Sequence, residues 1–309
     1  MKETPTSDRQ QAINTALARL DAWMDTMRGA RGYSGPIADW WRQGFTWTGT
    51  ALDWRYEGVI TGYIELWRRT GDGHWLAKAQ WAGDDLLAGQ LPGGRFTHGP
   101  WERGSYTAGT PHEAACAGAL LLLAQGLRES ASAVWQPYAS AAELTIHGTL
   151  LGELWDADLR LFRDAPAGGA FLPHQNAAIC DALFRQSELR QQIGPVEQYA
   201  LPVIRTIAAG QIRAPGDPLD GAIPYRLSGN QVPIKFLPMC IARCVPTLAC
   251  AYDWTGDASL LEVAWRAFAF IQRWRNDDGS FPAVVYPGGR SNQYPHWIAA
   301  TGDVIRAAH

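Results

Sequence analysis

Two segments 185 residues apart match each other closely enough to show that this chain is built from repeated units. Residues 70–81 (TGDGHWLAKAQW) and 255–266 (TGDASLLEVAWR) share Thr-Gly-Asp, followed by a leucine and an alanine at the same places. The same offset superimposes the Gly-x-Phe motif of residues 94–96 on that of residues 279–281. Such a repeat constrains the fold more than any local pattern, because each unit must bury its apolar face against its neighbours.

A second pattern divides the chain further. Four segments place a proline four residues before an alanine and then open an apolar run; the prolines are Pro111, Pro173, Pro238 and Pro295. They are 62, 65 and 57 residues apart, and one more step of 57 towards the N-terminus reaches Trp54, in the run DWRYEGVITGYIELW. The sequence therefore predicts five units of roughly 60 residues, each with room for two helices.

Each of these positions is expected to begin a helix, because proline is favoured in the first helical turn. The runs that follow, such as AACAGALLLLAQ, are apolar on nearly all sides, which is typical of interior helices, whereas the helices between them, such as LLEVAWRAFAFIQRW, are amphipathic. We therefore predict an all-α fold, one domain over residues 1–309, that forms an (α/α)5-like toroid of about five helical hairpins in two concentric rings. The predicted inner helices are 54–69, 111–128, 173–189, 238–254 and 295–308. No convincing run of strand-like alternation appears, and a substantial β-sheet domain would contradict this prediction.

The connections between these helices differ in length. Those that lead from an inner to an outer helix are short, and Thr-Gly-Asp suits them, since glycine can end one helix and aspartate can cap the next. Those that lead from an outer to an inner helix run to about 15–25 residues, at 31–51, 93–110, 156–172, 213–236 and 277–293. Connections of that length are uncommon without a functional reason. We expect all five at the end of the ring where the inner helices begin, together with any active site.

With this arrangement the chain resembles the α/α-toroid superfamily, which includes six-hairpin glycosidases, (α/α)-barrel polysaccharide lyases, glucuronyl epimerases, terpenoid cyclases and lanthipeptide cyclases. The motif Thr-Gly-Asp-x-x-x-Leu-x-x-Ala followed by Gly-x-Phe is similar to repeats in the carbohydrate-active members. The Asp-x-Asp-Asp acid motif of class II terpenoid cyclases is missing. The resemblance implies the ring architecture over nearly the whole chain, and it implies function by analogy only.

Three of the seven histidines directly follow the prolines that begin inner helices: His112, His174 and His296. The helix dipole disfavours a charged imidazole at such a position, so that a histidine there stays available as a base. They could instead cap or pack the helix starts. A three-histidine metal site is a further alternative, although no metal or other cofactor is predicted.

Carboxylates accompany these histidines. Asp53 and Glu57 are four residues apart on the first inner helix and thus share a face, and Glu113 follows His112. They could supply the acid and base of glycoside chemistry, which needs two carboxyl groups about 5–9.5 Å apart. An ordinary ion-paired helix start, Asp53-Arg55-Glu57, is the alternative.

Two further side chains suggest a lyase-like reaction. In such a reaction an amide or guanidinium neutralises the carboxylate of a uronate, so that a neighbouring base can remove the adjacent proton. Asn176 and Arg243 are the candidates. Arg243 lies within the apolar run MCIARCVPTLAC, where a charge is costly unless it is paired or faces a polar cavity.

Aromatic residues are frequent in and beside the long connections. Their faces could stack on sugar rings or shelter a carbocation, or they could clamp the loops to the ring. The candidates for substrate binding are Trp40, Trp41, Trp47, Trp54, Trp101, Tyr106, Tyr225, Tyr294 and Trp297.

Composition excludes some partners. The formal net charge is -3 and no basic run is present, which argues against nucleic acid, and no apolar segment approaches the ~20 residues that span a membrane. The five cysteines lie in apolar segments, which together with the polar N-terminus favours a reducing, cytoplasmic location. The sequence gives no oligomeric state.

These observations favour a carbohydrate-active enzyme, a hydrolase, lyase or epimerase, that acts on an acidic or uronate-containing small-molecule substrate by acid/base catalysis at the mouth of the ring. A cyclase or isomerase of an isoprenoid-type substrate is the alternative. A ring that binds a ligand or a protein without catalysis is a second alternative.

Overall fold

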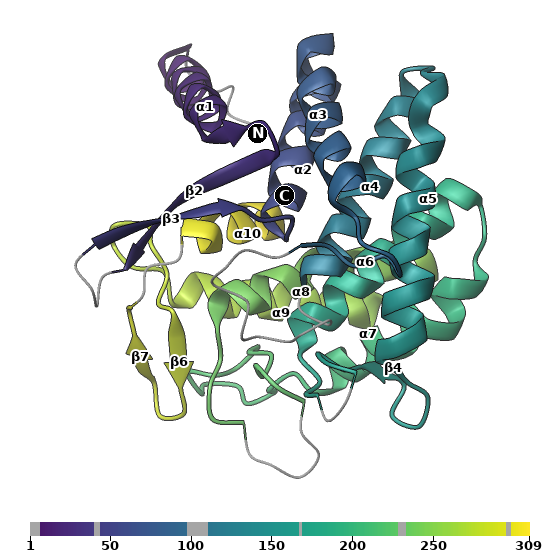
Figure 1. Ribbon diagram of the computed structural model, residues 1–309. Helices are drawn as coiled ribbons and strands as arrows, with labels where there is room; N and C mark the ends of the chain where they lie inside the picture. The colour runs from purple at the N-terminus through teal and green to yellow at the C-terminus, as the bar shows by residue number, and fades with distance from the viewer. Residues whose placement is uncertain (1–6, 40–43, 98–110, 167–168, 228–232, 295–297) are drawn as a thin grey trace.

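The computed structural model describes residues 7–39, 44–97, 111–166, 169–227, 233–294 and 298–309, and most of them are helical (Figure 1). The α-helices in these ranges are α1 (Ser7–Met27), α2 (Arg55–Thr70), α3 (Gly73–Gly89), α4 (Pro111–Glu129), α5 (Gln136–Leu144), α6 (Pro173–Arg190), α7 (Leu201–Ala209), α8 (Pro238–Thr255), α9 (Ala258–Arg273) and α10 (Ile298–Ala308). A 3₁₀ turn, η3 (Ala133–Trp135), precedes α5, a π-helical segment, η4 (Thr145–Leu154), continues it, and a second, η5 (Val196–Ala200), precedes α7.

The helix boundaries agree with the signals in the sequence. Three of the inner helices begin at the expected prolines, those of α4, α6 and α8. In each Thr-Gly-Asp turn, the glycine ends a helix with a left-handed backbone, and the aspartate caps the next helix by accepting a hydrogen bond from the amide two residues later. The repeat found in the sequence is therefore a repeated helix-turn-helix connection.

Two classes of helix pack together as predicted. Helices α2, α4, α6, α8 and α10 are neighbours in that order, and α3, α5, α7 and α9 pack against their outer sides. Residues 112–124 of α4 are all buried, whereas α9 buries Val263, Ala267 and Phe270 and exposes Trp265. The large core thus lies between the two sets of helices.

Short strands occur in the long connections, although the sequence shows no convincing run of strand-like alternation. A β-hairpin of β2 (Gly32–Asp39) and β3 (Gly44–Thr50) fills the first long connection, and β1 (Arg28–Gly29) pairs with β2. Two shorter pairs, β4 (Trp155–Asp156) with β5 (Leu161–Phe162) and β6 (Val284–Tyr286) with β7 (Arg290–Asn292), lie in later connections. A long connection must satisfy its backbone amides and carbonyls, and local pairing does this without the alternating pattern of a half-buried sheet.

The long connections lie at one end of the fold, because neighbouring ones are joined by backbone hydrogen bonds. The amide of Leu227 donates to Phe171 (2.8 Å), and Phe236 and Val285 exchange two bonds (2.8 and 2.7 Å). The amide of Leu52 donates to Thr97 (2.9 Å). The expectation that these segments meet where the inner helices begin is confirmed for the described connections.

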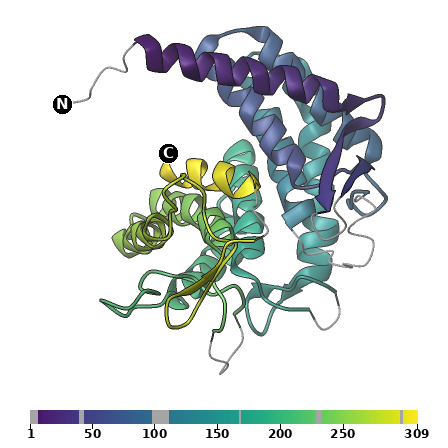
Figure 2. The ribbon, with the colours of Figure 1, turned by 90° about the vertical axis from the view of Figure 1, so that its left-hand side faces the viewer.

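Helix α1 is attached differently from the other outer helices. Its residues 8–20 are exposed, and Figure 2 shows its N-terminal half extending away from the other helices. Its C-terminal half is held by Lys78 of α3, which is buried and donates to Asp21 (2.6 Å) and Asp25 (2.8 Å). Asp21 also accepts a hydrogen bond from Tyr63 of α2 (2.9 Å).

We expect Gly94→Ala to destabilise the protein more than Gly93→Ala. Both glycines have positive φ (90° and 85°), but a Cβ on Gly94 would lie 2.6 Å from backbone atoms of Leu144 and Thr145, whereas nothing lies within 4 Å of one on Gly93. Each variant bears the left-handed backbone penalty of about 1–2 kcal/mol. Gly94→Ala should add about 1–3 kcal/mol of overpacking. Urea unfolding would measure both, and equal losses would contradict the close approach.

Candidate active site at the beginning of the inner helices

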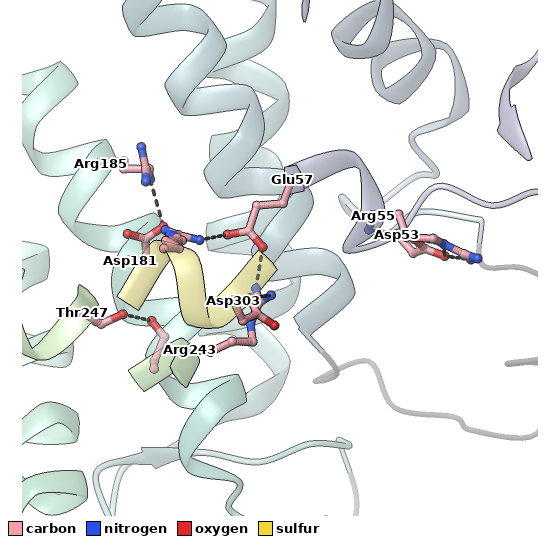
Figure 3. Close-up of polar contacts among 10 residues, drawn as sticks. Asp53, Arg55, Glu57, Asp181, Arg185, Arg243, Thr247 and Asp303 are labelled. Atoms are coloured by element: carbon pink, nitrogen blue, oxygen red, sulfur yellow. Dashed lines mark hydrogen bonds and ion pairs between the residues drawn. The ribbon is translucent and has the colours of Figure 1, made fainter. Parts of the chain in front are cut away.

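The centre of the ring contains six charged side chains from four inner helices, and we call them the central ion cluster. Their carboxylates and guanidiniums point toward one another between the helices (Figure 3). The members are Glu57 of α2, Asp181 and Arg185 of α6, Arg243 of α8, and Asp303 and Arg306 of α10.

Glu57 is the best-paired carboxylate of the cluster. Arg243 donates to its Oε2 at 2.5 Å and Arg306 to its Oε1 at 2.6 Å. Burial by itself would raise the pKa of Glu57, but the two arginines outweigh burial and hold its pKa below the usual value. Glu57 is therefore an ionised partner of two arginines in the folded protein.

Asp181 is held in the same way on the opposite side of the cluster. Arg185 donates to its Oδ2 at 2.9 Å and Arg306 at 3.3 Å. Burial by itself would raise the pKa of Asp181. The opposing effect of Arg185 and Arg306 is larger and lowers this pKa to about 2. Burial of a charge is costly unless an opposite charge lies close to it. Arg185 and Arg306 lie close enough to compensate the buried carboxylate of Asp181.

The sequence identified only part of this cluster. Arg243 was expected to be paired or to face a polar cavity, and it is paired, with Glu57 and Asp303. Four members were missed: Asp181, Arg185, Asp303 and Arg306. The same signal could have found Asp181, because it is a charged residue within the apolar run AAICDALF.

His174 lies beside this cluster, in the first turn of α6. It is 8% exposed, and its ring stacks on Tyr225 of the connection before α8, with 5.5 Å between centroids. Burial, with a further contribution from Arg243, lowers the pKa of His174 to about 3. Its Nδ1 is buried and has no hydrogen-bond partner among the described residues. His174 is thus a neutral imidazole with an unused nitrogen.

Tyr225 also contacts a cation. The Lys235 ammonium lies 4.4 Å from the centroid of the Tyr225 ring, so that imidazole and ammonium both lie over this phenol. Lys235 is exposed, and no ion pair engages it in the part of the chain that the structure describes. Tyr225 therefore contacts both the imidazole of His174 and the ammonium of Lys235.

Asn176, in the same turn as His174, is occupied by the backbone. Its Nδ2 donates to Phe162 (2.8 Å) and Leu172 (3.1 Å), and its Oδ1 accepts from the amide of Phe162 (2.8 Å). These bonds anchor the β4–β5 connection to the start of α6. Both amide hydrogens are used, so that a catalytic role of Asn176 would require these bonds to break.

A second group of predicted residues surrounds Cys116 on the α2–α4 side. Asp53, Glu57 and Glu113 all raise the pKa of the buried Cys116 thiol, after burial itself, which places the three carboxylates around it. Asp53 is completely buried and paired with Arg55, to one side of the central ion cluster (Figure 3). Glu113 and His112 are buried at the start of α4.

The remaining predicted residues are placed only in part. Trp54 is half-buried directly before α2, and Tyr294 is 64% exposed. Trp47 lies in β3, but its side chain is outside the description. Trp40, Trp41, Trp101, Tyr106, His296 and Trp297 lie outside the described residues. The structure brings Glu57, Arg243 and His174 together, while one shared cavity that includes His112 and His296 stays a prediction.

Two further properties concern the described part of the chain. Within it, no group of three or more His, Cys, Asp or Glu side chains is arranged to hold a metal ion. None of its helices is long and apolar enough to cross a bilayer.

We expect His174→Gln to weaken the dependence of stability on pH. The folded protein keeps the His174 imidazole neutral down to about pH 3, whereas the unfolded chain binds a proton below about 6.5, so that stability falls as the pH falls below 6.5. Between pH 7 and 5 the parent should lose about 2 kcal/mol more than the variant. Tyr225→Phe, which keeps the stacked ring, should behave like the parent. Parallel stability curves in urea unfolding would contradict a buried neutral imidazole.

The sequence matches no protein-family profile and no curated protein sequence. Its structure is similar to that of a family 76 α-mannanase from Bacteroides thetaiotaomicron (TM-score 0.65, 14% identity, 98% of this chain and 81% of that one). A sugar epimerase from a ruminal bacterium is also similar (TM-score 0.60, 15% identity, 85% of this chain and 75% of that one). So is a polysaccharide lyase (TM-score 0.56, 13% identity, 81% of this chain and 70% of that one). At these identities the likeness concerns the fold, and it confirms the predicted resemblance: this chain has the α/α-toroid fold of these enzymes.

Proposed function

We propose that this protein is a carbohydrate-active enzyme that acts on an acidic, uronate-containing saccharide by proton transfer at the beginning of the inner helices. The α/α-toroid neighbours are a mannanase, an epimerase and a lyase, which supports a saccharide substrate. Five helical hairpins, as in an (α/α)5-like ring, are part of this proposal.

The proposal depends on the buried imidazole of His174, whose Nδ1 has no hydrogen-bond partner among the described residues. A general base must be neutral at the working pH and must have a free nitrogen. His174 meets both conditions, since its pKa is lowered to about 3 and its Nδ1 has no described partner. A pKa this low makes the imidazole a weak base, and negative charge on a bound substrate would strengthen it by raising that pKa. An unsatisfied buried nitrogen costs about 1–3 kcal/mol, which is a reason to expect a functional use for it.

An acidic substrate is supported by the cations near His174. Removal of a proton next to a carboxylate becomes easier when positive charge neutralises the carboxylate. Arg243 already binds two carboxylates, whereas Lys235 lies against Tyr225, the ring that stacks on His174, without an ion pair from the described residues. Arg226, next to Tyr225, is also exposed. We assign the substrate carboxylate to Lys235 and Arg226, which makes elimination or epimerisation the favoured reaction type.

Hydrolysis is the second candidate, favoured by the carboxylates around Cys116. Asp53 and Glu113 are both buried near the start of an inner helix, the setting in which a pair of carboxyl groups could act as acid and base. Glu57 fits this chemistry less well, because two arginines keep it ionised.

A cyclase and a non-catalytic ring both receive less support from the site. A cyclase of isoprenoid-type substrates needs an apolar cavity, and six charged side chains occupy the centre of this ring. A ring that only binds another protein or a ligand would not need a buried imidazole whose Nδ1 lacks a hydrogen bond from the described residues.

We expect His174→Gln to reduce kcat by at least about 100-fold on an acidic saccharide, since a general base contributes about 10²–10⁴-fold. The measurement is turnover of polygalacturonate, alginate and hyaluronate, followed by the absorbance of the unsaturated product and by reducing ends. Circular dichroism and thermal melting would give the folded fraction, because a buried ring also contributes to stability. Unchanged turnover per folded molecule would show that His174 has a structural role and would contradict its assignment as the general base.

We expect Lys235→Gln to raise KM for an acidic saccharide by at least about tenfold, because loss of a charge-assisted contact costs roughly 1.5–3 kcal/mol and each 1.4 kcal/mol is a factor of about ten. The kcat should change little, since the ammonium contacts the substrate and not the transferred proton. Arg9→Gln, on the exposed and distant α1, is the matched loss of one positive charge. An equal effect of both variants would point to net charge alone.

A further inference from the structure

The three carboxylates of the central ion cluster are not equivalent. Both oxygens of Glu57 are bound by arginines at 2.5 and 2.6 Å, and Asp181 accepts from two arginines at one oxygen. Asp303 accepts a single, longer bond, from Arg243 to its Oδ1 at 3.2 Å. Its Oδ2 receives no hydrogen bond from the residues that the structure describes. Asp303 is therefore the carboxyl group that the arginines leave least satisfied.

The surroundings of Asp303 favour its protonated form. Burial raises its pKa to about 6, and Glu57 of α2 adds to this effect, while Arg243 of α8 and Arg306 of its own helix oppose it. The other titratable neighbour is Cys240 of α8, a thiol that stays neutral because burial raises its pKa to about 12. Asp181 of α6 is linked to Asp303 through a chain of ion pairs that passes through Arg306, Glu57 and Arg243.

The formal charges of the cluster balance when Asp303 is ionised, because three carboxylates then face three guanidiniums. With Asp303 protonated, two carboxylates face three guanidiniums, and the cluster has one net positive charge. An anionic substrate that binds nearby would supply the negative charge that Asp303 lacks when it is protonated. Binding of the acidic saccharide and retention of the Asp303 proton therefore support each other.

Arg243 is the neighbour that His174 and Asp303 share, because it donates to Asp303 and its charge lowers the pKa of His174. Titratable groups whose surroundings drive their pKa values apart are the usual acid and base of a site. Here the histidine is neutral and can accept a proton, while the aspartic acid can donate one.

We propose that Asp303 is the proton donor that acts with His174, an inference that rests on the proposed function. In elimination, His174 takes the proton from the carbon next to the uronate carboxylate, and the C–H electron pair forms the new double bond. The bond to the leaving oxygen breaks with its electron pair, and that oxygen takes the proton of Asp303. The proton on His174 then returns to Asp303 through solvent, so that both residues regain their starting forms.

The first test needs no substrate and compares Asp303→Asn with Asp181→Asn. A raised pKa means that ionisation of Asp303 destabilises the folded protein as the pH rises through 6. Asp303→Asn should therefore melt like the parent at pH 4.5 and above it at pH 8. Asp181→Asn removes an ionised partner of two arginines and should melt below the parent at pH 8. If Asp303→Asn gains no stability relative to the parent between pH 4.5 and 8, the inference is overturned.

The second test is turnover of the same three uronate polymers across pH. The parent should lose kcat as the pH rises above about 6, because the donor is then deprotonated. Asp303→Asn should reduce kcat at least 100-fold, with KM within threefold of the parent, and the remaining rate should lack that decline. Full activity of this variant would overturn the role of Asp303 and leave His174 in place. If the parent turns over none of the polymers, the proposed function fails, and the donor role fails with it.

Discussion

The ion pairs of Glu57 with Arg243 and Arg306 are the interaction on which the rest of this structure depends. They join α2, the first inner helix, to α8 and α10, across 186 and 249 residues of sequence. Removing one partner of a buried ion pair typically costs 3–5 kcal/mol, because the other charge stays buried without compensation. The centre of the ring must therefore be almost completely paired. In the function that we propose, proton transfer therefore falls to groups that the arginines leave incompletely paired.

The connections at the mouth are shaped by a second constraint, the need to satisfy backbone groups in long segments. They do so through short strand pairs, through bonds from one connection to the next, and through side chains such as Asn176. Because Asn176 ties the β4–β5 connection to the start of α6, it helps to cover the region around His174. The same connections supply Tyr225 and Lys235, so that loop and helix start together form the site.

The structural neighbours share this ring but include a mannanase, an epimerase and a polysaccharide lyase. A fold that supports several reactions does not by itself decide among them. The function that we propose for this protein therefore rests on the charges of the site, namely a neutral histidine, an incompletely paired aspartate and an exposed lysine. The carboxylates around Cys116 keep hydrolysis as the competing candidate.

The sequence by itself determined the helix-turn-helix repeat, the starts of the inner helices and the common end of the long connections, because these follow from local rules. Proline begins a helix, Thr-Gly-Asp joins two helices, and an all-round apolar run must be buried. It also identified Arg243, since a lone charge in such a run requires a partner. Only the tertiary structure decided which partner. Glu57, Asp303 and Arg306 meet because α2, α8 and α10 converge, and a separation of 249 residues leaves no periodic trace in the sequence. The strand pairs and the burial of His174 against Tyr225 likewise depend on contacts between distant segments, which local patterns do not record.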